Sequence, residues 1–290
     1  MDAQGSSFLP AAPNPRVARA FAWYTRRLFS KRFFAVRLTP GSRGLLSGLR
    51  DHPGPAIVLM SHASWWDPMT AVLLNCEFTE DRPTAAPMDI AMLRRFAFFR
   101  KLGVFGINPD DPASLEAMGR YMLDRFAADT RTNLWVTAQG EFHDPRTPAR
   151  LRPGAAWLAA RTPGVRVLCC AIEYAFWTDQ RPETFICVQP VLPAERTGAL
   201  STADWLRATQ AAMTACAATL ADAVISRDPN RFDTLLGGDG ARVNPLFDLW
   251  QRLRGRGNAI EVRSRQAGPT TTEPTSTEPT LTEQTRSAGA

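Results

Sequence analysis

The sequence predicts an α/β fold: a single domain with a mixed, largely parallel sheet flanked by helices. Short apolar runs such as AIVLM (56–60) have the length and composition of strands that are buried on both faces. These runs alternate with segments of helical periodicity, and such alternation is typical of α/β proteins. The 290 residues, 44% hydrophobic and 21% charged, are enough for a domain with a sizeable core.

The first half of the chain justifies this class element by element. Pro15 opens a segment in which Val17, Phe21, Tyr24 and Leu28 recur at helical spacing, so we expect a helix to about Leu38. A strand at 56–60 follows, and Asp67 with Pro68 gives a helix-start signal, a capping carboxylate before a first-turn proline. The remaining elements expected here are a basic and aromatic helix at 89–101, a strand at 103–107 and a helix within 109–129.

In the second half, apolar runs predict strands at 133–139, 165–176 and 184–192, and helices are expected at 154–162 and over the Ala-rich segment 201–226. Composition divides the chain into three parts. Residues 1–40 combine a Pro-rich, disordered start with an amphipathic interfacial helix, 41–255 form the folded domain, and 256–290 are a disordered Thr/Pro/Glu-rich tail.

The formal net charge of +6 favours anionic partners. Arg and Lys cluster at 26–37 and 94–101, where aromatic residues lie between them. This mixture suits a membrane surface, stacking on single-stranded nucleic acid, or ordinary helices packed on the core. Because RNP, KH and helix-turn-helix patterns are absent from the sequence, we expect a membrane surface rather than nucleic acid as the partner.

The numbers and spacings of the cysteines and histidines indicate the redox compartment and whether a zinc site is expected. The five cysteines form no CxxC pair, which favours a reducing compartment, and none of the three histidines has the spacing of a zinc site. Neither a signal peptide nor a run of about 18 uncharged apolar residues is recognisable. We therefore expect no metal, no bound cofactor, and a cytoplasmic protein peripheral to the inner face of the cell membrane.

His62 and Asp67 are the strongest candidates for chemistry. His62 follows the buried strand at 56–60, and the carboxyl ends of strands are the usual place for ligand-facing residues in open α/β sheets. An imidazole can take a proton from a hydroxyl, and a carboxylate on its second nitrogen orients it. Across a loop that turns into a helix, two residues five apart can converge. The plainer alternative is a surface histidine beside a helix-capping aspartate.

Four segments together resemble the glycerolipid acyltransferase family, which acylates glycerol phosphate and lysophospholipids. They are SHASWWDP, LGVFGI, LWVTAQGEFHDP and RLRPGAAWLAARTPGVRVLCCAIEY, in the family's order over about residues 50–195. The resemblance implies that His62, oriented by Asp67, activates a hydroxyl of a lysophospholipid or other lipid. That hydroxyl attacks an acyl thioester of coenzyme A or acyl carrier protein, without a covalent enzyme intermediate, so Ser61 and Ser64 are not nucleophiles.

The later blocks depart from the family pattern. Asn108 and Pro109 stand where the second block has a basic residue for the acceptor phosphate, and Ala138-Gln139-Gly140-Glu141 replaces Pro-Glu-Gly-Thr. The acceptor site is therefore expected to differ, and a catalytically silent protein that only binds lipid is the alternative. The candidate substrate-binding residues are Trp65, Trp66, Gln139, Gly140, Glu141 and His143. The backbone at Gly140 is a candidate oxyanion donor, and Arg146, Arg150 and Arg152 could supply charge or only form a solvated loop.

Overall fold

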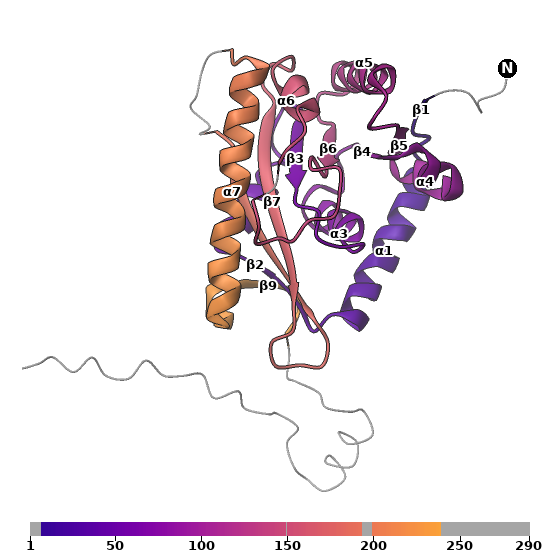
Figure 1. Ribbon diagram of the computed structural model, residues 1–290. Coiled ribbons are helices and arrows are strands. Elements are labelled where there is room, and N and C mark those ends of the chain that lie inside the picture. Colours follow the sequence, from indigo (N-terminus) through magenta and orange to yellow (C-terminus); the bar gives the residue numbers. More distant parts are fainter. Residues whose placement is uncertain (1–6, 149, 193–198, 239–290) are drawn as a thin grey trace, which may run out of the picture. The chain divides into compact units, whose positions relative to one another are not determined.

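A nine-stranded sheet forms the centre of the described part of the chain and confirms the predicted mixed, largely parallel α/β class (Figure 1). The computed structural model describes residues 7–148, 150–192 and 199–238. The strands are β1 (Phe8–Leu9), β2 (Ala35–Leu38), β3 (Ala56–Met60), β4 (Thr84–Asp89), β5 (Val104–Ile107), β6 (Asn133–Val136), β7 (Arg166–Ala175), β8 (Glu183–Pro190) and β9 (Asp233–Gly237). Their order is β1-β5-β4-β6-β3-β7-β8-β2-β9, and five of the eight neighbouring pairs are parallel.

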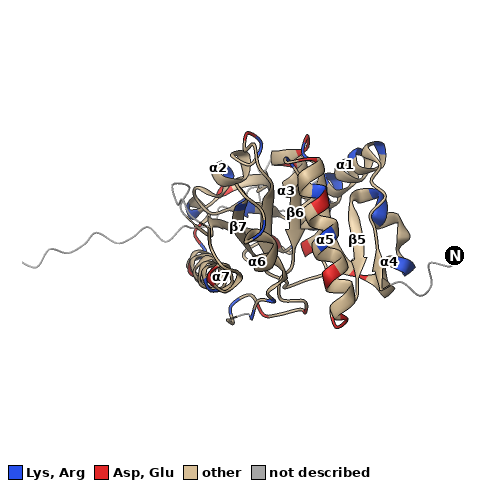
Figure 2. Cartoon of the chain, turned by 90° about the horizontal axis from the view of Figure 1, so that it is seen from above, with Lys and Arg blue, Asp and Glu red and all other residues tan. Residues whose placement is uncertain are grey.

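Helices cover both faces of this sheet. They are α1 (Pro15–Arg32), α2 (Ser42–Ser47), α3 (Asp67–Thr79), α4 (Ile90–Arg95), α5 (Pro112–Ala128), α6 (Gly154–Ala159) and α7 (Thr202–Ser226), with the short 3₁₀ helices η1 (Ala97–Leu102) and η2 (Pro229–Arg231). Seen from above, α1, α2 and α3 lie along one side of the sheet, and α5, α6 and α7 lie along the other (Figure 2).

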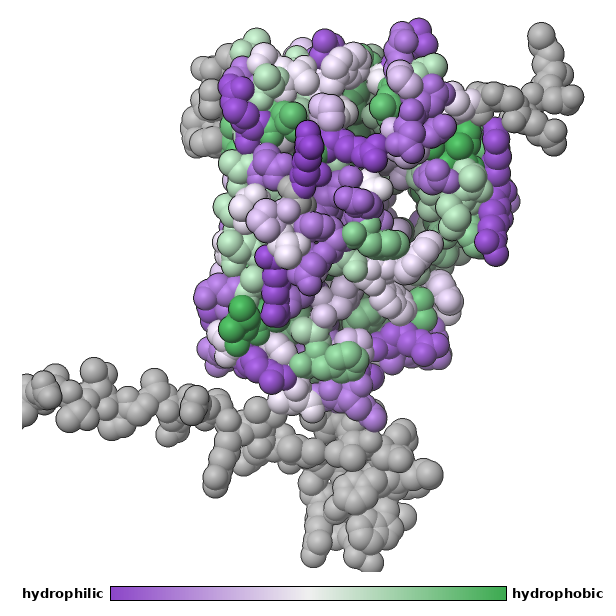
Figure 3. All heavy atoms as spheres, in the orientation of Figure 1, coloured by the Kyte–Doolittle hydropathy of each residue, from purple (hydrophilic) through white to green (hydrophobic). Residues whose placement is uncertain are grey.

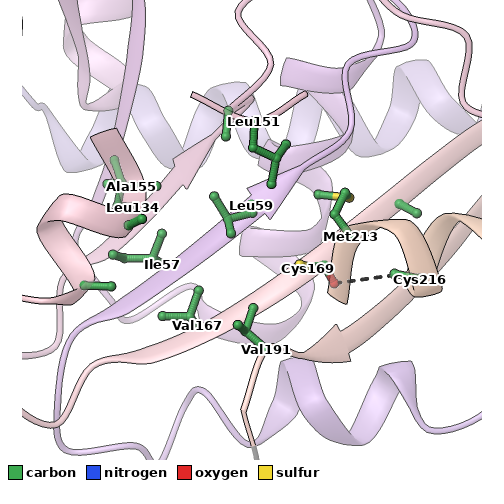
Figure 4. Close-up of a cluster of buried hydrophobic side chains, with 14 of the residues drawn as sticks. Ile57, Leu59, Leu134, Leu151, Ala155, Val167, Cys169, Val191, Met213 and Cys216 are labelled. Carbon is green, nitrogen blue, oxygen red and sulfur yellow. Dashed lines mark hydrogen bonds between the residues drawn. The ribbon is translucent and has the colours of Figure 1, made fainter. Parts of the chain in front are cut away.

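The central strand β3 is buried on both faces, as its continuous apolar run predicted. Ile57 and Leu59 enter the core beneath α5, α6 and α7, which Figure 4 shows in close-up. Val58 and Met60 enter the second core, beneath α1, α2 and α3. Because successive side chains of a strand point to opposite faces, one short run can supply both cores.

Helix α7 packs along β7 and β8 (Figure 1). It begins with a capping box in which Ser201 and Asp204 bond each other's backbone N–H groups. Within the described residues it is the one helix that by length and apolar composition alone could cross a membrane. Its buried residues include Thr209, Met213 and Cys216, so one face of α7 packs on the sheet and the core.

The predicted helix from Pro15 to Leu38 is wrong in its last turn. It ends at Arg32, and residues 35–38 form β2, which pairs with β8 in parallel and with β9 in antiparallel orientation. Arg37, counted in the basic cluster at 26–37, lies in this strand and donates from Nε to the buried Glu183 carboxylate at 2.5 Å. Tertiary pairing and a buried ion partner therefore override the helical pattern at this end.

The Pro-rich start before Pro15 was predicted to be disordered, yet residues 8–14 are held in place. Phe8 and Leu9 pair with β5, the Ala12 N–H donates to the carbonyl of Arg100, and the Asn14 N–H donates to that of Lys101. The expected basic helix at 89–101 is two short helices, α4 and η1, which meet at Phe96. The predicted tail at 256–290 and the end of the predicted domain at 239–255 lie outside the described residues.

Candidate active site

The loop after β3 places His62 at the carboxyl edge of the sheet. Ser61 is buried, and its Oγ accepts from the N–H of Ile172 on β7 at 2.9 Å. On the other side, the His62 N–H donates to Oε1 of Gln139 at 2.6 Å, and the His62 carbonyl accepts from the His143 N–H at 2.7 Å. Bonds to β7 and to the loop after β6 thus fix the backbone that carries the imidazole.

His62 and Asp67 converge, as the sequence predicted for a loop that turns into a helix. His62 Nδ1 lies 2.8 Å from Asp67 Oδ2, and the Asp67 side chain is fully buried while 18% of the His62 side chain is exposed. The same Oδ2 accepts from the Ser64 N–H at 2.8 Å. Because a carboxylate can only accept, this contact assigns the proton of a neutral imidazole to Nδ1 and leaves Nε2 as the proton acceptor.

Asp67 does not cap α3, contrary to the helix-start interpretation. The N-cap position is Trp66, which makes no side-chain capping bond, and Asp67 and Pro68 are the first two residues of the helix. The Asp67 carboxylate instead points back into the preceding loop. The proline still sets the start of α3, and the carboxylate is left to hold His62.

Tyr174, on β7, is a site residue that sequence reasoning missed. Its hydroxyl donates to Asp67 Oδ1 at 2.8 Å and lies 2.9 Å from Thr70 Oγ1 on α3. Burial, and next the Asp67 carboxylate, raise the pKa of Tyr174 well above its usual value, so the phenol remains a donor. Alternation along β7 could have placed Tyr174 on the same face as Cys170 and Ile172, but it does not identify a partner.

A large cavity of about 2310 Å³ borders His62. Of the predicted site residues, His62, Trp65, Gln139, Gly140 and Glu141 line its wall. The cavity extends to α1, η1 and the amino end of α5, and Figure 3 shows an opening in this face of the molecule. Sites for small ligands usually measure about 300–1,000 Å³, so this volume exceeds that of an ordinary small-ligand site.

An exposed aromatic ring, Phe142, lies against the imidazole, and a second, Trp65, packs on Phe142. The Phe142 ring lies 4.3 Å from the His62 ring, between centroids, and 5.5 Å from the Trp65 ring. Phe142 is 49% exposed and Trp65 72% exposed, and both line the cavity. Phe142 was absent from the predicted site, and the only signal for it in the sequence is its place directly after Glu141.

Trp66 and His143 lie away from the cavity wall. Trp66 packs between α1 and the sheet, with edge-on contacts to Phe29 at 5.7 Å and Phe33 at 4.9 Å. The His143 ring bonds the Thr147 hydroxyl through Nε2 at 2.7 Å, within its own loop. Among the six predicted substrate-binding residues, these two therefore support the fold rather than face a ligand.

Gly140 is not placed as the predicted oxyanion donor, because its N–H already donates to the Thr137 carbonyl at 3.2 Å. Its φ of +79° forms the turn, and Arg152 packs so closely that a Cβ would lie 2.7 Å from Arg152 Nε. The other candidate cations have partners or face solvent. Arg146 forms a two-pronged ion pair with the buried Glu173, whereas Arg150 is exposed on the cavity rim.

The part of the chain that the structure covers contains no group of three or more His, Cys, Asp or Glu side chains suited to a metal ion. No protein-family model matches the chain, and no curated protein matches it.

Proposed function

We propose that this protein is an acyltransferase that moves an acyl group from a thioester to a hydroxyl of a lipid. The single observation that carries the proposal is the 2.8 Å contact of His62 Nδ1 with the fully buried Asp67 at the wall of the large cavity. The resemblance to the glycerolipid acyltransferases around the same residues supports the same activity. Coenzyme A and acyl carrier protein are the proposed donors.

His62 would act as the general base, and Asp67 would orient its imidazole. Nε2 takes the proton of the acceptor hydroxyl while the oxygen attacks the thioester carbonyl, and the Asp67 charge stabilises the imidazolium that forms. The tetrahedral intermediate then collapses, the carbon–sulfur bond breaks, and the thiolate takes the proton back from Nε2. The products are an ester and a free thiol, so no acyl-enzyme is needed. Ser61 and Ser64 stay structural, since their Oγ atoms accept from backbone N–H groups.

Gln139 supplies the proposed oxyanion donor. Its Oε1 is used by the His62 backbone, which leaves the amide nitrogen as the donor of a side chain that lines the cavity. A side-chain amide is a known type of donor to a tetrahedral oxyanion. This assignment replaces Gly140 and gives a role to the residue that stands where the family has Glu.

The acceptor is proposed as a lysophospholipid or another lipid with a free hydroxyl. At the position of the family's phosphate-holding residue, the Asn108 N–H donates to Ser114 Oγ at 2.8 Å, so this segment builds a turn at the start of α5. Charge for a phosphate could come only from other groups of the cavity, such as Arg152.

A lipid-binding protein without catalysis is the second candidate. The departures from the family pattern favour it, because the Asn108 N–H is bonded to Ser114 where the family has a phosphate-holding residue, and Gln139 stands in place of Glu. The two candidates differ in one measurable respect, which is whether a thioester is consumed in proportion to ester formed.

His62→Ala is the variant that separates them. We expect transfer of a radiolabelled acyl group from acyl-coenzyme A or acyl carrier protein to lysophospholipids to fall about 10²–10⁴-fold in kcat. His52→Ala is the matched control, since its ring bonds the Gly164 carbonyl outside the cavity and it should keep the activity of the native protein. Full activity in His62→Ala would refute the mechanism, and thioester-independent lipid binding alone would favour the second candidate.

A further inference from the structure

We propose that α1 and the α4–η1 segment together form one docking surface for an anionic lipid bilayer. The sequence suggested two separate basic and aromatic segments, and the structure brings them side by side. We call this the α1–η1 surface. Its members are Arg19, Phe21, Trp23, Tyr24, Arg27, Arg95, Phe96, Phe98 and Phe99.

Aromatic contacts join the two halves. Phe21 of α1 lies 5.4 Å from Phe98 and 6.3 Å from Phe99 of η1, between ring centroids. Each of the two segments also exposes a large apolar side chain: Trp23 of α1 is 66% exposed, and Phe98 of η1 is 45% exposed. Exposed aromatic rings gathered from two segments exceed the scattered apolar residues of an ordinary surface and suit a membrane interface.

The surface is already built in the protein alone. The backbone N–H groups of Ala12 and Asn14 donate to η1 carbonyls, and the Asn14 side chain caps the first turn of α1. Farther along the helix, Arg26 forms an ion pair with Glu77 of α3. Docking therefore requires no folding of α1, whose ordering would otherwise weaken binding.

The positive charge of the α1–η1 surface favours an anionic bilayer as its partner. Neither 15–38 nor 90–107 contains an Asp or Glu, and Figure 2 shows α1 and α4 with basic segments only. Arg27 lies over the Trp23 ring at 5.9 Å and Arg95 over the Phe96 ring at 5.3 Å, so cations and aromatic rings share the same surface. Anionic headgroups complement these cations, and they are typical of the cytoplasmic leaflet.

The cavity distinguishes a bilayer from nucleic acid. Phe21 and Phe99 line the same cavity as His62, so the α1–η1 surface borders the space that the proposed acyl transfer uses. A bilayer docked there would present its lipids at one end of this cavity. This inference rests on the proposed function and extends it, because it names the source of the lipid acceptor. Nucleic acid on the same surface would have no use for an apolar cavity.

The test is flotation of the full-length protein with vesicles of phosphatidylcholine, with or without phosphatidylglycerol. We expect Trp23→Ser with Phe98→Ser to weaken binding to the mixed vesicles about tenfold or more, because both rings leave the interface. Arg27→Ala and Arg95→Ala should each weaken it roughly fivefold on the mixed vesicles only. Phe176→Ser with Ile225→Ser is the matched control, since both are 64% exposed outside this surface, and it should bind normally.

Equal flotation of the aromatic pair variant and its control would overturn the proposal. So would binding of single-stranded RNA without vesicle binding, or a dimer that these substitutions dissociate. His62→Ala should float like the native protein, so a failure of catalysis and a failure of docking are distinguishable. Deleting residues 1–40 would not serve, because the deletion removes β2 and its pairing with β8 and β9.

Discussion

Two loops at the same edge of the sheet carry the candidate site, and they are held very differently. The loop of residues 61–66 follows β3, and that of 139–148 follows β6, its parallel neighbour. In the first, backbone and side-chain bonds converge on His62 and on the buried Asp67. In the second, Glu141 and Phe142 are exposed, and the Arg146 charge is taken up by Glu173.

The difference assigns the two loops different tasks. Burying a carboxylate costs free energy unless its oxygens accept hydrogen bonds. Substitutions that remove the hydrogen-bond donors around Asp67 are therefore expected to be destabilising. An exposed loop carries no such constraint and can vary with the ligand. We infer that the β3 loop, held by Gln139, fixes the proposed proton transfer, whereas the exposed part of the β6 loop at Glu141 and Phe142 determines which ligand enters the cavity. Replacing one carboxylate by its amide in each loop tests this division of tasks directly.

The largest effect is expected from the carboxylate of the first loop. Asp67→Asn keeps the shape of the side chain but removes the charge that would stabilise the imidazolium. We expect kcat to fall about 10²–10⁴-fold with a much smaller change in KM. Steady-state kinetics of acyl transfer measures it, and circular dichroism checks that the fold is retained.

Glu141→Gln is the matched exchange in the second loop. The Glu141 carboxylate lines the cavity but is exposed, so its loss should change kcat by less than about threefold. A change in the KM for the lipid acceptor would agree with a role of Glu141 in the entry of the acceptor into the cavity. Equal losses of kcat in both variants would contradict the division of tasks between the loops.

A smaller effect is expected at Tyr174, which positions Asp67 and contacts no substrate. Tyr174→Phe removes the donor to Oδ1, and we expect about a tenfold loss of kcat, about 1.4 kcal/mol, at unchanged KM. The unsatisfied carboxylate oxygen should also cost about 1–3 kcal/mol in the free energy of unfolding, measured in urea. A loss of stability without any change in kcat or in its pH profile would reduce Tyr174 to a packing role.

The same hydroxyl has a pH signature. Because the pKa of Tyr174 is raised in the fold, its contribution to stability is complete below the unfolded value, about 10, and is lost as the pH rises toward the folded value. Ultraviolet titration should therefore show the Tyr174 phenolate only together with unfolding. Early ionisation in the native protein, identified by comparison with Tyr174→Phe, would contradict the buried bond to Asp67.

Sequence reasoning succeeded where local pattern and tertiary structure agree. The apolar run at 56–60 is β3 to the residue, and His62 follows it at the sheet edge as expected. It failed at residues 35–38 because the strand there depends on β8, β9 and the distant Glu183. It missed β4 (Thr84–Asp89) because this strand holds Pro87 and no run of β-branched residues.

Within the site, short-range relations were predictable and long-range ones were not. His62 and Asp67 are five residues apart, and Pro68 indicated the turn that brings them together. The partner of Asp67 is 107 residues away on β7, and no spacing rule reaches it. Among the loop residues, sequence position could not tell Phe142, which contacts the imidazole, from its neighbour His143, which does not.

That last distinction gives the smallest predicted effect. His143 was a candidate site residue, but it holds the loop through its backbone N–H to the His62 carbonyl, a bond that an alanine at this position keeps. Its ring serves only the exposed contact with Thr147. We therefore expect His143→Ala to change kcat/KM less than about twofold and the free energy of unfolding by about 0.5 kcal/mol or less. A loss of kcat close to that of His62→Ala would mean that the ring turns into the cavity during turnover, and it would move His143 from the supporting loop to the reacting groups.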